Sequence, residues 1–287
     1  MNEKTYLIKC SSAGGFANKL FGWEYAYSLA ALNGMGVVCD WPVLEHITLP
    51  NTMRIDRMPY PEQTIKIDGR TIPPPYLLEK EKHYELTCGF DFPRVFEQGY
   101  ADAGKRPISE MELRDQKLDA TISRFMNMTP FVVGVHIRKG DYINTGGRFV
   151  AQCPFRVPDA WYFRMMSAVR KAVPGVVFYL ASDGTKEELQ PYYDNFPCTD
   201  NRIFSDEFTK AGQGKTHHAA RKEDMADLFA LASTKLLICS VSTFSMVAYS
   251  MYDIPVLWPE AELQTLQTIK RHRDSPRQVL VDIETLK

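Results

Sequence analysis

The sequence predicts an α/β protein of two domains, each built on a parallel sheet. Short runs of apolar and β-branched residues alternate with longer amphipathic stretches, first at the start of the chain and again after Pro130. Strands that are apolar along their whole length and are separated by helices are typical of a parallel sheet with both faces covered. The length of 287 residues also suits two domains, since a domain usually has about 150 residues.

The first series opens as strand, helix and strand. Its expected strands are residues 5–10 and 35–40, and the expected helix between them is 18–33. Residues 41–107 follow and contain nine of the eighteen prolines. Because proline interrupts helices and strands, this insert is expected to be irregular and rich in loops.

A further helix is expected over about 110–126, where Ser109 and Glu112 have the spacing of a capping box. Its apolar face would contain Met111, Leu118, Ile122 and Phe125. Pro130 disfavours a helical Thr129, so the helix should end just before that residue. We therefore expect the N-terminal domain to cover residues 1–128.

The second series predicts four strands and three helices. The expected strands are 131–137, 176–182, 235–241 and 254–258, and the expected helices lie near 159–172, near 219–233 and from about residue 243. This series defines a C-terminal domain over residues 129–262. A terminal segment, 263–287, follows it.

Composition excludes several classes of protein. The chain has 34 basic and 35 acidic residues and a net charge of −1, which disfavours binding to a nucleic-acid backbone. It begins without the features of a signal peptide, and no apolar run approaches the roughly 18 residues that span a bilayer, so we expect a cytoplasmic protein without a transmembrane segment. The six cysteines stand singly and no Asp-x-Asp occurs, so neither a metal nor a cofactor is expected.

The first candidate site follows the apolar strand 131–137. Alternation along the strand places His136 and Arg138 on one face at its carboxyl end, where ligands bind in open α/β sheets. An arginine beside a glycine turn is suited to a bidentate contact with phosphate. In the alternative interpretation, Arg138 pairs with Asp141 and only stabilises the turn.

The second candidate site lies around Asp227 and the turn at Ser242 and Thr243. Asp227 is expected on a helix among apolar residues, where a carboxylate is costly unless a ligand or a donor satisfies it. Ser242 and Thr243 follow a strand and open a helix, so hydroxyls and free backbone N–H groups meet where an anion can bind. In the alternative interpretation, Thr243 is an ordinary N-cap.

The third candidate site is the turn after the first strand. Gly14 and Gly15 lie there, and a turn of two glycines allows backbone amides to come close to a ligand. Glu24 is a lone carboxylate in the helix that follows. It either pairs with a partner in the core or lines a site.

Together these segments resemble the GDP-fucose-dependent fucosyltransferases, most closely the α-1,2-fucosyltransferase family, glycosyltransferase family 11. Four segments of this chain are similar to motifs of the family and occur in the same order. They are the glycine-rich Gly14–Leu20, His136–Asp141 for a His-x-Arg-Arg-x-Asp motif, Ser182-Asp183 at a strand end, and Asp227-Leu228 with Ser242–Ser245. Two positions depart from the family pattern. Lys139 replaces the second arginine, and Met246-Val247 replaces an aromatic pair.

The resemblance implies a GT-B fold, which consists of two Rossmann-like domains facing across a cleft. It implies that the nucleotide binds the C-terminal domain, that the N-terminal domain receives the acceptor, and that 263–287 packs back on the N-terminal domain. The implied activity is an inverting, metal-independent transfer of L-fucose from the donor GDP-β-L-fucose to a hydroxyl of a glycan acceptor, with an α-1,2 linkage as the product.

The resemblance assigns Asp227 to the guanine base, with His136 nearby. The chemistry of the reaction makes Arg138 the candidate that meets the charge on the β-phosphate. Asp141 is the candidate base, with the alternative that it only braces Arg138. The other residues placed at GDP-fucose are Gly14, Gly15, Asn18, Asp183, Ser242, Thr243 and Phe244. A GT-B enzyme for another nucleotide sugar and a non-catalytic nucleotide-sugar or glycan-binding protein remain as alternatives. The acceptor and the oligomeric state are not readable from the sequence.

Overall fold

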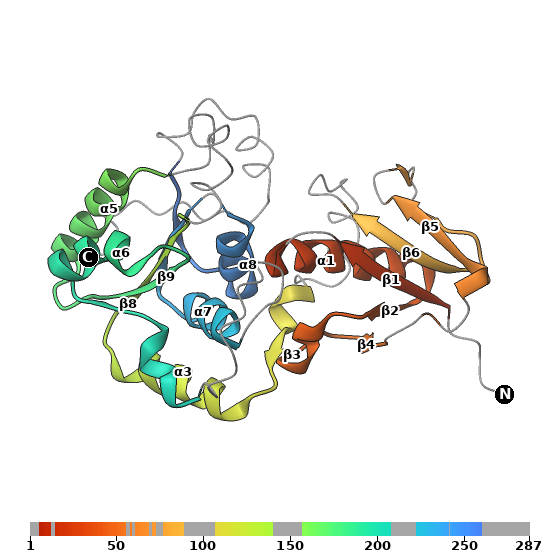
Figure 1. Cartoon of the computed structure of the whole chain (residues 1–287), viewed down its shortest axis with the longest axis horizontal. Coiled ribbons are helices and arrows are strands. Elements are labelled where there is room, and N and C mark those ends of the chain that lie inside the picture. Colours follow the sequence, from red (N-terminus) through yellow and green to blue (C-terminus); the bar gives the residue numbers. More distant parts are fainter. Residues whose placement is uncertain are drawn as a thin grey trace. The chain divides into compact units, whose positions relative to one another are not determined.

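The computed structural model of the chain describes residues 6–12, 15–55, 58, 61–68, 71–72, 77–88, 107–139, 157–207, 222–240 and 242–259. These residues form two compact units, each with its own parallel sheet (Figure 1). The described residues up to Asp115 belong to the first unit, and those from Gln116 onward belong to the second. The division thus falls ahead of residue 128, because α3 (Gln116–Met128) packs against α7 (Lys222–Ala232) of the second unit.

The first unit has a five-stranded parallel sheet in the order β4-β2-β1-β6-β5. Its strands are β1 (Leu7–Ser12), β2 (Gly36–Cys39), β4 (Thr52–Arg54), β5 (Thr64–Asp68) and β6 (His83–Cys88). Helix α1 (Phe16–Asn33) packs on β1, β2 and β6 and buries residues on most of its surface. The strands and the helix expected in the first series are therefore confirmed.

The expectation that residues 41–107 would be irregular is wrong in part, because three strands of the sheet, β4, β5 and β6, come from this insert. The longest of them, β6, lies between β1 and β5 and pairs with β1 over five residues. These strands are short and contain lysine, glutamate and threonine, so no continuous apolar run indicates them. Pairing with neighbouring strands gives them their conformation: β6 pairs with β1, β5 with β6, and β4 with β2. The short 3₁₀ helices here are η1 (Pro42–Glu45) and η2 (Pro61–Gln63).

The expected capping box at Ser109 and Glu112 is also wrong. Ser109 lies in the 3₁₀ helix η4 (Pro107–Glu110), and Glu112 lies in β7 (Glu112–Leu113), which pairs antiparallel with β3 (Ile47–Thr48). Arg114 holds this pair, since its backbone N–H donates to the carbonyl of His46 (2.8 Å) and its Nε donates to that of Ile47 (2.9 Å). The helix therefore begins only at Gln116.

The second unit has a five-stranded parallel sheet in the order β10-β9-β8-β11-β12. Its strands are β8 (Val132–Ile137), β9 (Val177–Ser182), β10 (Cys198–Thr199), β11 (Leu236–Ile238) and β12 (Val256–Leu257). In chain order this is 3-2-1-4-5, the arrangement of a Rossmann-like sheet. The strand order reverses between β8 and β11, which makes this position the topological switch point.

Helices cover both faces of the second sheet (Figure 1). On one side lie α5 (Asp159–Ala172) and α6 (Lys186–Asn195), and on the other lie α3, α7, α8 (Thr243–Tyr252) and the 3₁₀ helix η5 (Asn201–Glu207). Neighbouring side chains of β9 show the alternation: Phe178 packs on Phe196 after α6, and Tyr179 packs on Phe125 of α3. Helix α6 was not expected, although Thr185 and Glu188 form a complete capping box at its start. No helix in the described part of the chain is long and apolar enough to cross a membrane.

Gly134 of β8 allows α7 to lie directly on the centre of this sheet. A Cβ at Gly134 would come within 2.9 Å of Leu231 Cδ2 and Leu237 Cδ1 and within 3.0 Å of Thr234 Oγ1. All three neighbours are buried, so none can move into solvent. The absent side chain therefore sets the distance between α7 and the strand that leads to His136.

We predict that Gly134→Ala lowers the free energy of unfolding by about 1–3 kcal/mol, the usual cost of overpacking a core. The measurement is a urea unfolding curve. Gly15→Ala is the matched control, because Gly15 has φ −66° and nothing lies within 4 Å of an added Cβ. A Gly134→Ala protein as stable as the control would show that α7 is not packed against β8 as described.

Candidate functional site

The carboxyl ends of β8 and β11 bring several of the predicted site residues together. These two strands flank the topological switch point, and ligands of open α/β sheets bind outside the carboxyl ends of the strands at such points. His136 lies near the end of β8, and Ser240 follows β11 by two residues. Ser240 Oγ is 2.8 Å from His136 Nδ1, so the two strand ends are in direct contact.

His136 is part of a buried polar cluster. Its Nδ1 also lies 2.6 Å from Ser245 Oγ of α8, and its ring lies 5.1 Å from the ring of Phe244. Burial, and secondarily the charge of Arg138, lowers the pKa of His136 to about 3. The imidazole is therefore neutral at physiological pH.

Arg138 is held by Asp183, which directly follows β9. Arg138 Nη1 and Asp183 Oδ2 are 2.7 Å apart, and Asp183 Oδ1 accepts the backbone N–H of Lys139 at 2.7 Å. The side chain of Arg138 is 31% exposed and that of Asp183 is 28% exposed. A partly exposed guanidinium that is oriented by a carboxylate can contact an anion through its planar set of N–H donors. Asp141, the other partner considered for Arg138, lies outside the described residues.

The side chain of Lys139 has a different acidic partner from that of Arg138. Its ammonium is buried and lies 2.6 and 2.7 Å from the two carboxylate oxygens of Asp159, the first residue of α5. The hydroxyl of Tyr192 donates to Asp159 at 2.6 Å. Lys139 thus attaches the end of β8 to α5. This contact explains how a lysine is accommodated beside Arg138, because the carboxylate of Asp159 neutralises it.

The first turn of α8 lies beside His136, because Phe244 in this turn packs on the imidazole ring. Ser242 is the N-cap, and its Oγ accepts the backbone N–H of Phe244 at 3.2 Å. The alternative in which Thr243 is the N-cap is therefore wrong, because Thr243 is the first helical residue. The first turn of α8 carries no acidic side chain, so no carboxylate repels an anion at this positive end of the helix.

Asp227 of α7 lies in a different cluster, on the side of the sheet that also carries α3. Its Oδ1 accepts the hydroxyl of Tyr179 at 2.7 Å, and its Oδ2 accepts the amide of Asn201 at 3.2 Å. Burial raises the pKa of Asp227 to about 8 despite these two donors, and the charge of Asp224 adds to the rise. The carboxyl group is therefore mostly protonated at neutral pH.

The predicted site residues of the first unit lie around the start of α1. Gly14 is outside the described residues, and Gly15 is the N-cap of α1 without a side-chain hydrogen bond. Asn18 lies in the first turn of this helix. Its Oδ1 is the one buried side-chain oxygen or nitrogen that lacks a hydrogen-bond partner among the residues that the structure describes. An unsatisfied buried acceptor is costly and indicates a missing donor. Glu24 is fully buried in α1.

Four residues of these clusters were given no role by the sequence, although Ser245 ends one of the quoted motifs. Ser240, Ser245, Tyr179 and Asn201 contact predicted site residues directly. Serine after a strand is too common to stand out, and the contacts join residues 26 to 109 positions apart. Within the described ranges, no group of three or more histidine, cysteine or acidic side chains could hold a metal ion.

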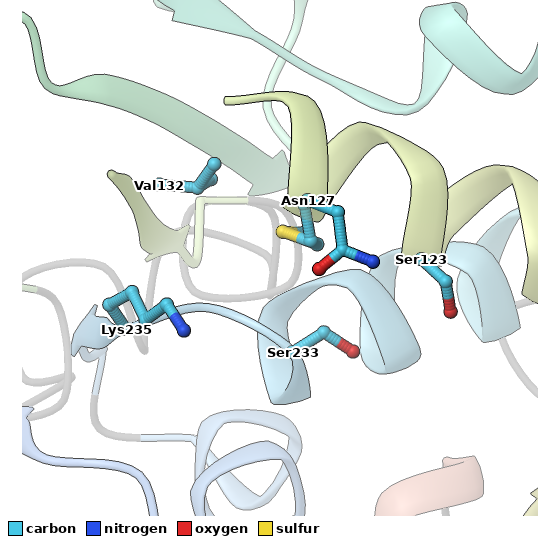
Figure 2. Close-up of a pocket in the computed structure, with 6 residues that line it drawn as sticks. Ser123, Asn127, Val132, Ser233 and Lys235 are labelled. Carbon is cyan, nitrogen blue, oxygen red and sulfur yellow. The ribbon is translucent and has the colours of Figure 1, made fainter. Parts of the chain in front are cut away.

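A polar pocket of about 210 Å³ lies at the opposite edge of the second sheet. It is lined by Ser123, Met126, Asn127, Val132, Ser233 and Lys235, and Figure 2 shows the polar ends of Asn127, Ser233 and Lys235 turned toward the same space. Val132 and Lys235 stand at the amino ends of β8 and β11, where the backbone N–H of Lys235 donates to the carbonyl of Val132 at 3.0 Å. None of the predicted site residues lines this pocket.

Fold and site together define a protein of two Rossmann-like domains with a cationic, hydroxyl-rich switch point in the second. No protein-family model and no curated protein matches the sequence. Solved structures do match. Fucosyltransferase NodZ from Bradyrhizobium has a TM-score of 0.52 and 14% identity over 90% of this chain and 97% of NodZ. An Arabidopsis thaliana FUT1 mutant in complex with GDP has a TM-score of 0.54 and 11% identity over 88% of this chain and 70% of FUT1.

POFUT1 in complex with GDP is a third similar structure, with a TM-score of 0.51 and 11% identity over 87% of this chain and 95% of POFUT1. NodZ is further described as an alpha-1,6-fucosyltransferase and has been co-crystallised with GDP. At these identities the similarity establishes the fold. It confirms the expected fold class, α/β with two Rossmann-like domains of the GT-B type.

We predict a pH-dependent stability that Asp227→Asn removes. The pKa of Asp227 is raised in the folded state, so the folded protein binds this proton more tightly than the unfolded chain does. Its contribution is fully present below the unfolded pKa, near 4, and is lost as pH rises to the folded pKa, about 8. The free energy of unfolding of the wild type should therefore fall relative to Asp227→Asn over this window, by up to about 1.4 kcal/mol per pH unit, and then level off. The measurement is a urea unfolding curve of each protein at several pH values. The same pH dependence of the free energy of unfolding in both proteins would contradict the raised pKa of Asp227.

Proposed function

We propose that this protein is a fucosyltransferase that uses GDP-β-L-fucose as its donor. One observation carries the proposal: His136, Arg138, Asp183 and the start of α8 meet at the switch point of the second sheet. These are the residues of three motifs that resemble the GDP-fucose-dependent fucosyltransferases. The fold of the chain, which is similar to three solved fucosyltransferases, supports the same conclusion.

The donor pyrophosphate is proposed to bind between Arg138 and the first turn of α8. Arg138 contributes a planar set of N–H donors, and α8 contributes free backbone N–H groups together with the hydroxyls of Ser242 and Thr243. Asp183 orients the guanidinium by its 2.7 Å ion pair. Gly14, Gly15 and Asn18 of the first unit remain proposed contacts of GDP-fucose. Among the described residues Asn18 Oδ1 has no hydrogen-bond donor, and a ligand hydroxyl or amide can supply one.

The chemical step is proposed to be an inverting displacement at the anomeric carbon of fucose. The bond from this carbon to the β-phosphate oxygen breaks, and its electron pair stays on GDP. The acceptor oxygen forms the new bond on the opposite face and loses its proton to a base. Arg138 stabilises the negative charge that grows on the β-phosphate, because a preorganised donor interacts most strongly with the transition state. Asp141, outside the described residues, remains the proposed base.

Guanine is proposed to bind Asp227 with Phe244 and His136 nearby. The N1–H and N2–H groups of guanine need a carboxylate acceptor, whereas the pKa of Asp227 is about 8 without a ligand. Binding must therefore release a proton. The two oxygens of Asp227 already accept from Tyr179 and Asn201, which fixes their orientation and leaves one lone pair on each.

The linkage and the acceptor are proposed from the sequence motifs, which are most similar to the α-1,2 family. The fold does not decide the linkage, because NodZ, an alpha-1,6-fucosyltransferase, has a similar structure. We assign the acceptor to the N-terminal domain and the donor to the C-terminal domain. Analysis of the product after incubation with GDP-fucose and a panel of glycans tests the proposed linkage and the choice of acceptor.

GDP should raise the melting temperature at concentrations where UDP and ADP do not. A ligand that binds only the folded state stabilises it by about 2.7 kcal/mol at a hundredfold excess over Kd, so the shift should be measurable by thermal denaturation. Since Asp227 must lose a proton to bind guanine, the GDP affinity should also increase as pH rises toward about 8. Equal shifts with all three nucleotides would favour an enzyme for another nucleotide sugar.

Turnover should persist in EDTA. The proposed phosphate site neutralises the pyrophosphate with Arg138 and the start of α8, and the sequence has no Asp-x-Asp motif. The measurement is GDP release from GDP-fucose with and without chelator, in the presence of an acceptor. Activity that is lost with EDTA and restored by manganese or magnesium would refute the proposed phosphate site.

Arg138→Ala should lower kcat by about 10²–10³, corresponding to about 3–4 kcal/mol for one lost preorganised donor. Arg138→Lys should recover little, because an ammonium lacks the two-pronged geometry of a guanidinium. Lys139→Ala is the matched control: it removes a neighbouring cation that binds Asp159, so it should lower stability and change kcat by about tenfold or less.

Circular dichroism must first show that these variants are folded, because Arg138 and Lys139 both hold the end of β8 through acidic partners. A folded Arg138→Ala enzyme with a near-normal kcat would exclude the proposed role. A folded protein that binds GDP-fucose but releases no GDP with any acceptor would instead support a non-catalytic binding protein.

A further inference from the structure

Three buried polar atoms form a closed triangle at the switch point of the second sheet. His136 Nδ1 lies 2.6 Å from Ser245 Oγ and 2.8 Å from Ser240 Oγ, and the two hydroxyl oxygens are 3.2 Å apart. His136 is 5% exposed, Ser240 1% and Ser245 0%, so water does not compete for these hydrogen bonds. The proton arrangement inside the triangle is therefore decided by the three groups themselves.

The number of hydrogens shared by the imidazole and the two hydroxyls favours one tautomer of His136. If Nδ1 carries the proton, it donates to one hydroxyl, that hydroxyl donates to the other, and the last hydroxyl hydrogen has no acceptor in the triangle. If Nδ1 is unprotonated, one hydroxyl donates to Nδ1 and the other donates to the first oxygen or to Nδ1. The second arrangement uses every hydrogen, and a buried donor without an acceptor is strongly disfavoured.

We propose that Ser240 and Ser245 are positioning residues that keep the proton of His136 on Nε2, so that the imidazole offers a neutral N–H donor to the bound nucleotide. The nucleotide as the ligand rests on the proposed function. The position of the proton rests only on the geometry of the triangle.

The surroundings of His136 support this assignment. Nε2 is on the far side of the ring from both serines and makes no hydrogen bond to another described residue. The ring is held by Phe244, and the backbone carbonyl of His136 accepts the hydroxyl of Tyr162 at 3.2 Å. The ring therefore has a fixed position with one nitrogen left for a ligand at the carboxyl end of β8.

Burial, and secondarily the neighbouring charge of Arg138, keeps the ring neutral. Burial and Arg138 lower the pKa of His136 to about 3. Among the described residues, Asp183, the partner of Arg138, and the pair of Lys139 with Asp159 are the other charged groups at this end of β8, and each lies beside a partner of opposite charge. His136 should therefore act as a donor of constant charge between about pH 5 and pH 8, where an exposed histidine would titrate.

The direct test is the protonation state of the imidazole nitrogens in the ligand-free protein, measured by ¹⁵N NMR with labelled histidine. The sequence has six histidines, and the signals of His136 are identified by their loss in His136→Gln. We expect Nε2 to be protonated and Nδ1 unprotonated, with no change between about pH 5 and pH 8. A proton on Nδ1, or a titration in this range, would overturn the proposal.

The role of the serines is tested by the double variant Ser240→Ala/Ser245→Ala. Its His136 nitrogens should shift toward the average of two exchanging tautomers, and Kd for GDP should rise about three- to tenfold, the loss of one neutral hydrogen bond. Ser250→Ala is the matched control, a buried serine on the same helix, and it should change neither measurement. An unchanged tautomer in the folded double variant would refute the role of the serines.

A second pair of variants tests the same idea without touching the serines. His136→Gln places an amide at the position of Nε2, and His136→Asn places one at the position of Nδ1. The glutamine variant should retain more affinity for GDP, and the reverse order would contradict the proposal. If no nucleotide binds the wild type, the proposed function fails, while the NMR signals of the ligand-free protein still decide what the two serines do.

Discussion

Parallel pairing between β8 and β11 is the interaction on which the candidate site depends. Leu236, Leu237 and Ile238 pair with Val133, Gly134 and Val135, and this register places the residues that follow β11 beside the last residues of β8. The chain reaches β11 only after β9, β10 and α7, and the strand order reverses at this pair. Residues more than a hundred positions apart, His136 and Ser240, are therefore within hydrogen-bond distance.

Close packing makes this pairing compatible with a buried site. Gly134 has no side chain, so α7 approaches the sheet through Leu231, and Thr234 fits the same space. On the opposite face Tyr162 of α5 reaches the backbone of His136. The strand end is thus held from both faces, which is the rigid support that a preorganised hydrogen-bonding site requires.

Two consecutive cations at the end of β8 are directed to opposite sides by two carboxylates. Arg138 pairs with Asp183 after β9, and Lys139 pairs with Asp159 at the start of α5. Alternation along an extended chain separates the two side chains, and each pair reduces the repulsion between neighbouring positive charges. The pair of Arg138 and Asp183 is partly exposed, whereas the buried ammonium of Lys139 connects two elements of the fold.

The sequence by itself determined the elements with strong local signals. The apolar strands β1, β8, β9 and β11, the helix that begins at Thr243, and the carboxyl-end position of His136 and Arg138 follow from periodicity and hydrophobicity alone. Strands β4, β5 and β6 could not be predicted in this way, because short polar strands acquire their conformation from pairing with a neighbour. The start of α3 could not be predicted either, because the residues ahead of it form β7, which pairs with β3. Partners were decided only by the tertiary structure: Asp183 for Arg138, Tyr179 and Asn201 for Asp227, and two serines for His136. The reason is physical, since a hydrogen bond depends on distance and burial, and both arise only when strands far apart in the chain lie side by side.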